Sequence, residues 1–276
     1  MAINPLKYVK AVVLDWAGTV VDHGCIGPVA VFVEVFKRHG VDVTVAHARK
    51  PMGLMKKDHV RSMTRDPEVA ALWRAAHGRD PDEADVDAMY LLTEPLMVEC
   101  IARHADIIPG ALDAVAAFRA MGLKVGSTTG YTRPMMDVMT VEAAKKGYVP
   151  DTMVCSSDTP AGRPTPFMCY QAALNLGVFP FWEMVKIGDT ESDVAEGKNA
   201  GMWTIGLSTS GNEMGLTEAE LAALDPAEKA ARQEAVTKRL LAVGAHYVVP
   251  SLADCPPLLA EIDARLARGE RPSCKA

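Results

Sequence analysis

Short apolar runs rich in valine and isoleucine alternate with longer stretches in which apolar residues recur every three or four positions. The short runs have the length of buried strands, and the longer stretches have the spacing of amphipathic helices. Strands that alternate with helices form parallel sheets, because a helix supplies the crossover that a parallel pair needs. We predict six such strands, at residues 11–15, 123–128, 152–155, 184–188, 202–206 and 246–249.

The alternation stops between the first and second of these strands. Residues 23 to about 105 contain several helical segments in succession with no strand between them. Gly and Pro occur at both junctions, in "VVDHGCIGP" and "ADIIPGA", and suit hinges between domains. We therefore predict a doubly wound, Rossmann-like α/β core, formed by residues 1–22 and 106–276, with an inserted helical domain at 23–105.

Composition narrows the possible functions. The chain has 276 residues, 49% of them hydrophobic, so it can bury one large core or a core and a smaller domain. The net charge of −6 and the lack of a basic stripe argue against nucleic-acid binding. No apolar window approaches a membrane span, and the N-terminus has no signal-peptide pattern. Six widely spaced cysteines without a CxxC pair suggest reduced thiols, so we expect small-molecule chemistry in the cytoplasm.

Polar groups follow four of the predicted strands. The first ends on Asp15, the second on "GSTTGYT" with Thr129 and Gly130, and the third leads to Arg163 in "AGRPTP". The fourth ends on "GDTESD", which contains Asp189 and Asp193. Ligands of doubly wound sheets bind beyond the carboxyl ends of the strands. The sequence therefore predicts one site that gathers these residues.

These residue types suit phosphoryl chemistry. A carboxylate such as Asp15 can attack phosphorus and form an acyl phosphate. Thr129 and the Gly130 N–H can hold phosphoryl oxygens, and Arg163 can neutralise them. Asp15 and Asp189 can hold a Mg²⁺ ion, without which two carboxylates would repel a phosphoryl dianion. Asp193 is open to two interpretations, as a residue that supports the metal site or as a helix cap.

The order of these four motifs resembles the haloacid dehalogenase superfamily. Most phosphatases of that superfamily carry a second Asp two residues after the nucleophile, where it protonates the leaving oxygen. In this sequence that position is Ala17. Loss of such an acid would cost about 10²- to 10⁴-fold in rate, unless the leaving group is carbon. A carbon leaving group needs an electron sink, which a carbonyl condensed with a lysine amine provides.

The predicted helical domain offers such a lysine in "ARKPMGLMKKDHVRSM". Lys56 and His59 share a helix face at i, i+3 spacing, whereas Lys57 points about 100° away and is expected to face solvent. This segment, with "DWAGTVVDHGC", "GSTTGYTRPMMD", "AGRPTPFMCY" and "GDTESDVAEGKNAGMWT", resembles the phosphonoacetaldehyde hydrolase (phosphonatase) family over nearly the whole chain.

The resemblance implies hydrolysis of the P–C bond of phosphonoacetaldehyde to acetaldehyde and phosphate, in the degradation of 2-aminoethylphosphonate. It makes Asp15 the nucleophile and Lys56 the Schiff-base lysine, and it makes the inserted domain a C1-type cap in a homodimer. The implied Mg²⁺ ligands are Asp15, Asp189 and the backbone carbonyl of Ala17. The residues it implies near the aldehyde are Cys25, Met52, His59 and Tyr131.

Three alternatives remain open from the residues alone. The chain could hydrolyse a phosphate ester, such as a sugar phosphate, with Mg²⁺, although Ala17 disfavours this. A halide-releasing dehalogenase would have little use for Asp189 and a metal. The chain could also be an inactive phosphate-binding module, although the presence of Asp15, Asp189, Arg163 and Lys56 argues against this. Separately, Cys25 and Met52 could be packing residues only.

Overall fold

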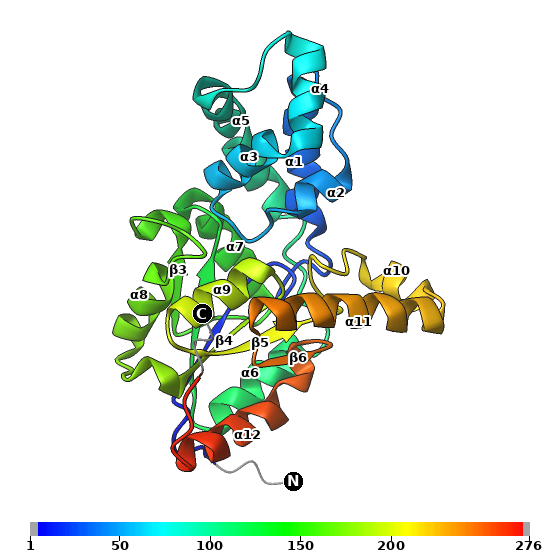
Figure 1. Cartoon of the computed structure of the whole chain (residues 1–276). Coiled ribbons are helices and arrows are strands. Elements are labelled where there is room, and N and C mark those ends of the chain that lie inside the picture. Colours follow the sequence, from blue (N-terminus) through cyan, green and yellow to red (C-terminus); the bar gives the residue numbers. More distant parts are fainter. Residues whose placement is uncertain (1–4, 273–276) are drawn as a thin grey trace.

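The computed structural model describes residues 5–272, so that Cys274 lies outside the described part. Figure 1 shows a twisted sheet with helices on both faces and a cluster of helices above it. All six predicted strands are present, and each boundary agrees with the prediction within one residue. Their bounds are β1 Ala11–Leu14, β2 Lys124–Thr129, β3 Thr152–Cys155, β4 Met184–Gly188, β5 Trp203–Leu207 and β6 Tyr247–Val249.

The six strands form one parallel sheet in the order β3-β2-β1-β4-β5-β6. The strand order reverses at β1, whose Leu14 lies opposite Ser127 of β2 and Ile187 of β4. The fold class is therefore the predicted doubly wound α/β sheet. Because all strands run the same way, the residues that follow β1, β2 and β4 reach the same edge of the sheet at this reversal point.

Helices cover both faces of the sheet. Val12 and Leu14 of β1 belong to the core on one face, and Ala11 and Val13 to the core on the other. This alternation is what a strand buried on both faces requires. The first face carries α6 Ala111–Ala120, α7 Arg133–Lys145 and α12 Pro256–Ala267. The second face carries α8 Phe167–Leu176, α9 Glu191–Asn199 and α11 Pro226–Val243.

The remaining elements of the core are short. They are the helix α10 Glu218–Ala223 and three turns of 3₁₀-helix at Ser156–Asp158, Phe181–Glu183 and Leu252–Asp254. Among the residues from 5 to 272, no helix is both long and apolar enough to cross a bilayer. The five cysteines in this range carry no disulfide bond and are all buried.

Five helices lie between β1 and α6, and we call them the helical insertion. They are α1 Ile26–Arg38, α2 Val45–Arg49, α3 Lys56–Arg65, α4 Pro67–His77 and α5 Glu83–Ile101. The long helices α1 and α5 pack against each other, and α3 packs against α5 and α4. Buried Phe32, Met63, Trp73 and Met89 form its interior. Figure 1 shows the insertion standing above the sheet, with the loop that precedes α3 reaching down to it.

Candidate active site

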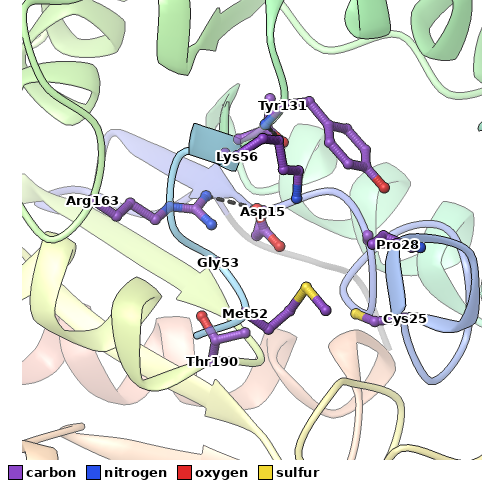
Figure 2. A pocket seen from close by; sticks show the side chains of 12 residues that line it. Asp15, Cys25, Pro28, Met52, Gly53, Lys56, Tyr131, Arg163 and Thr190 are labelled. Atoms are coloured by element: carbon purple, nitrogen blue, oxygen red, sulfur yellow. Dashed lines mark hydrogen bonds and ion pairs between the residues drawn. The ribbon is translucent and has the colours of Figure 1, made fainter. Parts of the chain in front are cut away.

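A cavity lies between the sheet edge and the helical insertion. The core contributes Asp15 and the residues after β2, and the insertion contributes the loop before α3 and Lys56. Figure 2 shows these side chains converging on Asp15. The complete lining is Asp15, Ala17, Cys25, Pro28, Met52, Gly53, Lys56, Thr129, Gly130, Tyr131, Arg163 and Thr190. Nine of the residues that the sequence singled out are therefore together in one cavity: Asp15, Ala17, Cys25, Met52, Lys56, Thr129, Gly130, Tyr131 and Arg163.

Asp15 lies directly after β1, where its backbone N–H donates to the Ile187 carbonyl at 2.9 Å and continues the parallel ladder. Its side chain is buried, and its Oδ1 accepts a hydrogen bond from Arg163 Nη2 at 2.6 Å. Burial raises the pKa of Asp15, and Arg163 opposes that rise. The ion pair holds the carboxylate in one orientation and leaves its Oδ2 without a hydrogen bond to any residue from 5 to 272.

Lys56 is the first residue of α3 and only 3% exposed. Its Nζ lies 4.5 Å from the ring centroid of Tyr131 and 5.7 Å from that of Phe32. Burial lowers the pKa of Lys56 to about 8, with Asp15 and Cys25 opposing the shift and Arg163 adding to it. The amine is therefore much closer to neutrality than an exposed lysine. Lys57 instead points to the surface, as predicted, and there it pairs with Asp87.

His59 follows Lys56 by one helical turn and is fully buried. It does not line the cavity. Its ring stacks on Phe32 with centroids 3.6 Å apart. Burial and the positive charge of Lys56 lower the pKa of His59 well below its usual range, so the imidazole is neutral. Burial also raises the pKa values of Tyr131 and Cys25 well above their usual ranges, so the phenol and the thiol keep their protons.

The loop that precedes α3 packs directly on the core. A Cβ atom at Gly130 would stand 2.5 Å from the Leu54 carbonyl oxygen and 2.8 Å from that of Gly53. A Cβ atom at Gly53 would stand 2.5 Å from Thr190 Oγ1. Glycine at both positions therefore permits the insertion to approach the backbone that follows β2 and β4.

Three buried carboxylates, those of Asp15, Asp189 and Asp193, have ligand atoms within 4.8 Å of one another and could hold a metal ion. Asp189 accepts hydrogen bonds from Thr19 Oγ1 at 3.2 Å and from the Asn212 backbone N–H at 2.7 Å. Burial, Asp15 and Asp193 all raise the pKa of Asp189 well above its usual range. A divalent cation would relieve this repulsion, so the residues fit a metal with oxygen ligands.

Asp193 has little capacity left for a metal. Its Oδ2 accepts from the Thr190 hydroxyl at 2.6 Å and from the Thr190 backbone N–H at 3.2 Å, and the second of these bonds completes the capping box of α9. Its Oδ1 lies 3.0 Å from Arg163 Nη1 and 2.9 Å from Lys186 Nζ. Of the two interpretations that the sequence left open for Asp193, the structure shows participation in the helix cap, together with an ion pair to Arg163.

Three of the lining residues, Pro28, Gly53 and Thr190, were not singled out from the sequence, and neither were Lys186 and Glu196 beside the cavity. Lys186 is the middle residue of β4, and Glu196 lies on α9. Both side chains are buried; Glu196 contacts Arg163 directly, and Lys186 contacts Asp193 and Glu196, which both hold Arg163. The one signal in the sequence was a lysine inside the otherwise apolar run 184–188.

Arg49 of α2 joins the insertion to the core on the other side of the cavity. Its Nη1 donates to the Gly24 carbonyl at 2.7 Å and to Asn212 Oδ1 at 3.1 Å, and its Nη2 donates to the Gly215 carbonyl at 3.0 Å. Asn212 Nδ2 donates back to the Arg49 carbonyl at 3.2 Å. The same Asn212 binds Asp189 through its backbone N–H.

Comparisons with known proteins agree with this geometry. Residues 9–201 match the model of the haloacid dehalogenase-like hydrolase family. A protein named phosphonoacetaldehyde hydrolase from Nitratidesulfovibrio vulgaris is 55% identical over 264 residues, which cover 96% of this chain and 94% of that protein. A protein of the same name from Bacillus cytotoxicus is 47% identical over 92% of this chain and 97% of its own length.

A solved structure of similar fold is described as a phosphonoacetaldehyde hydrolase like protein from Oleispira antarctica. It is 38% identical to this chain, superposes with a TM-score of 0.94, and the match covers 99% of both chains. The similarity therefore includes the helical insertion as well as the sheet.

Proposed function

Because the chain belongs to the haloacid dehalogenase-like hydrolases and, within them, to the phosphonoacetaldehyde hydrolase family, we propose that it hydrolyses the P–C bond of phosphonoacetaldehyde. The products are acetaldehyde and phosphate. One observation carries the mechanism: the buried amine of Lys56, whose pKa is lowered to about 8, lines the same cavity as the carboxylate of Asp15. Ala17 places no acid side chain in that cavity.

In the first step, Lys56 Nζ attacks the aldehyde carbon, and loss of water gives an iminium. The carboxylate of Asp15 then attacks phosphorus, and the electron pair of the P–C bond forms a C=C bond while the π pair of the iminium moves onto nitrogen, which gives a neutral enamine and an aspartyl phosphate. Water hydrolyses the aspartyl phosphate to phosphate and Asp15. The enamine takes up a proton at carbon, and water hydrolyses the resulting iminium to acetaldehyde and free Lys56.

The surrounding residues have supporting roles in this proposal. Thr129 and the Gly130 N–H hold phosphoryl oxygens together with Arg163. Tyr131, Cys25 and Met52 surround the aldehyde end, and the neutral His59 lies behind Lys56, where it can take part in proton transfer at the imine. Tyr131 also faces the Lys56 ammonium with its ring.

We propose that the metal is Mg²⁺, held by Asp15, Asp189 and the main-chain carbonyl of Ala17. Once bound, the ion supplies the positive charge that lets a phosphoryl dianion lie beside two carboxylates. Asp193 then acts from behind the site, through Arg163 and the cap of α9.

The helical insertion serves in this proposal as a C1-type cap, residues 23–105, that closes over a core of residues 1–22 and 106–276. Closure keeps bulk water away from the iminium until the phosphoryl group has been transferred to Asp15. The contacts of Gly53 and Leu54 with Gly130 support this, because the catalytic lysine belongs to the cap and the nucleophile to the core. We further expect a homodimer that works in the cytoplasm, which agrees with the five unpaired thiols among residues 5–272.

A phosphate-release assay with phosphonoacetaldehyde tests the proposal. We expect Mg²⁺-dependent turnover that Asp15→Asn and Lys56→Arg each abolish, while Lys57→Arg, one position along the same helix, retains it. Sugar phosphates under the same conditions should be poor substrates. Full activity of Lys56→Arg toward phosphonoacetaldehyde would refute the Schiff-base mechanism. Faster turnover of a sugar phosphate would show that the chain is a phosphate-ester hydrolase.

A further inference from the structure

Lys186 occupies an unusual position for a lysine. It is the third residue of the central strand β4, and its side chain is 1% exposed. Its Nζ donates to Thr128 Oγ1 at 2.9 Å and contacts Asp193 Oδ1 at 2.9 Å and Glu196 Oε2 at 3.2 Å. An ammonium group buried in a sheet is costly unless it is fully paired. These three contacts provide that pairing, but the proposed reaction gives Lys186 no role.

The partners of Lys186 are also the partners of Arg163. The Nε of Arg163 donates to Glu196 Oε2 at 2.9 Å, and its Nη1 lies 3.0 Å from Asp193 Oδ1. Each of these two carboxylate oxygens therefore contacts both cations. The remaining nitrogen, Nη2, donates to Asp15 Oδ1 at 2.6 Å and to the Thr128 carbonyl at 2.8 Å.

The charges explain why two cations are present. Arg163 contacts three buried carboxylates, Asp15, Asp193 and Glu196. Without Lys186, one guanidinium would have to balance all three, and the two carboxylates on α9 would attract it away from Asp15. Burial and Arg163 lower the pKa of Lys186, but Asp193 and Glu196 raise it further, so the ammonium keeps its charge.

We propose that Lys186 and Glu196 are positioning residues for Arg163. Together they keep the guanidinium paired with Asp193 and Glu196, so that its Nη2 faces Asp15 and the phosphoryl group. The role of Arg163 toward the phosphoryl group rests on the proposed function. Lys186 acts by neutralising the α9 carboxylates, and Glu196 acts by fixing Nε. Thr128 connects the two cations, because its hydroxyl accepts from Lys186 Nζ at 2.9 Å and from Arg163 Nη2 at 3.1 Å.

A set of four variants separates this role from simple core stability: Lys186→Met, Glu196→Gln, the double variant, and Val185→Ala. Val185 is also buried in β4 but is not part of the network, so it serves as the control for lost packing. Circular dichroism and thermal unfolding report folding. Two readouts follow function, the affinity for inorganic phosphate in the presence of Mg²⁺ and kcat/KM for phosphonoacetaldehyde.

We expect Lys186→Met to weaken phosphate binding and kcat/KM by about 10²-fold, the effect of losing one oriented donor at a developing charge. The double variant removes one negative charge together with the lysine. Its phosphate affinity and its kcat/KM should therefore each be at least about tenfold higher than those of Lys186→Met. Glu196→Gln alone should cost less than Lys186→Met, and Val185→Ala should lower thermal stability without a comparable loss of phosphate affinity.

The proposal is overturned if Lys186→Met binds phosphate within about threefold of the parent protein, or if the double variant is as impaired as Lys186→Met. If Lys186→Met does not fold, the phosphate affinity of the double variant is compared with that of Glu196→Gln. A difference in affinity above about 10²-fold would also overturn the proposal. Phosphate affinity does not depend on P–C cleavage. The expected pattern in phosphate binding would therefore support the positioning role even if phosphonoacetaldehyde were not a substrate, whereas a failed substrate assay alone counts against the proposed function.

Discussion

The lowered pKa of Lys56 leads to a quantitative prediction about imine formation. Only the neutral amine attacks an aldehyde, and the pKa of Lys56 is about 8 because the side chain is buried. At pH 7 about a tenth of Lys56 is then neutral, compared with about one part in three thousand of an ordinary lysine. The structure therefore predicts imine formation on the order of 300-fold faster at Lys56 than at an exposed lysine of equal access.

Reductive trapping measures this directly. The protein is incubated with acetaldehyde, the proposed product, and cyanoborohydride between pH 6 and pH 10, and the modified peptide is quantified by mass spectrometry. Modification of Lys56 should rise with pH and reach a plateau above about pH 8, because the folded-state pKa marks the loss of the proton. The neighbour Lys57, whose side chain is 37% exposed and pairs with Asp87, is the internal control, and Lys56→Arg should eliminate the main adduct.

A second variant tests the cause of the shift. Asp15 raises the pKa of Lys56, so Asp15→Asn should move the midpoint of the trapping curve to lower pH while leaving the adduct on Lys56. The role of burial would be refuted by a trapping midpoint near pH 10 for the parent protein, or by equal labelling of Lys57. The role of the Asp15 charge would be refuted by an upward shift of the midpoint in Asp15→Asn. None of these measurements requires P–C cleavage.

Three further predictions concern stability and the fit of the cap. Lys56→Met should stabilise the protein by about 1–3 kcal/mol at pH 7 in urea unfolding, because it removes a buried cation with no ion-pair partner among residues 5–272. Since the folded-state pKa of Lys56 is lowered, the parent protein should gain stability as the pH rises from about 8 toward 10.5. A stability difference between the two proteins that does not change with pH would contradict this. Gly130→Ala should raise KM about tenfold or more with little change in the melting temperature, since its Cβ would displace the loop at Leu54; unchanged steady-state kinetics would mean that the loop does not close on Gly130 during turnover. Ala17→Asp should lower kcat/KM for phosphonoacetaldehyde at least about tenfold and increase hydrolysis of p-nitrophenyl phosphate; an unchanged ratio of the two activities would remove Ala17 from the determinants of bond choice.

The strands and the position of the site could be predicted because both depend on local patterns. An apolar run with a polar residue after it indicates a buried strand and its carboxyl end. Because the strands are parallel, Asp15, Thr129 and Asp189 then reach the same edge of the sheet. The lining residues from the insertion, such as Lys56, could be predicted only because several motifs resemble those of a known family. These residues meet at the cavity because of how the insertion packs on the core. The spacing of apolar residues along the chain does not specify that packing.

Lys186 and Glu196 illustrate what local patterns miss. The run at 184–188 predicts a buried strand whether its middle residue is lysine or valine. The charge of Lys186 is acceptable only because β2 brings Thr128 and α9 brings Asp193 and Glu196 to the same point. Such pairing through the core arises from three elements distant in sequence, and no spacing rule along the chain specifies it.

Asn212 gives the site a thermodynamic connection that individual contacts do not reveal. Its side chain exchanges hydrogen bonds with Arg49 of the insertion, and its backbone N–H donates to Asp189 of the core. A movement of the insertion that shifts this loop therefore also changes the donor set of a carboxylate in the acidic cluster. By linkage, any factor by which docking of the insertion strengthens cation binding at Asp189 is the factor by which the cation strengthens docking. In the proposed mechanism the two equilibria would share one residue, so opening of the insertion and release of the cation would favour each other.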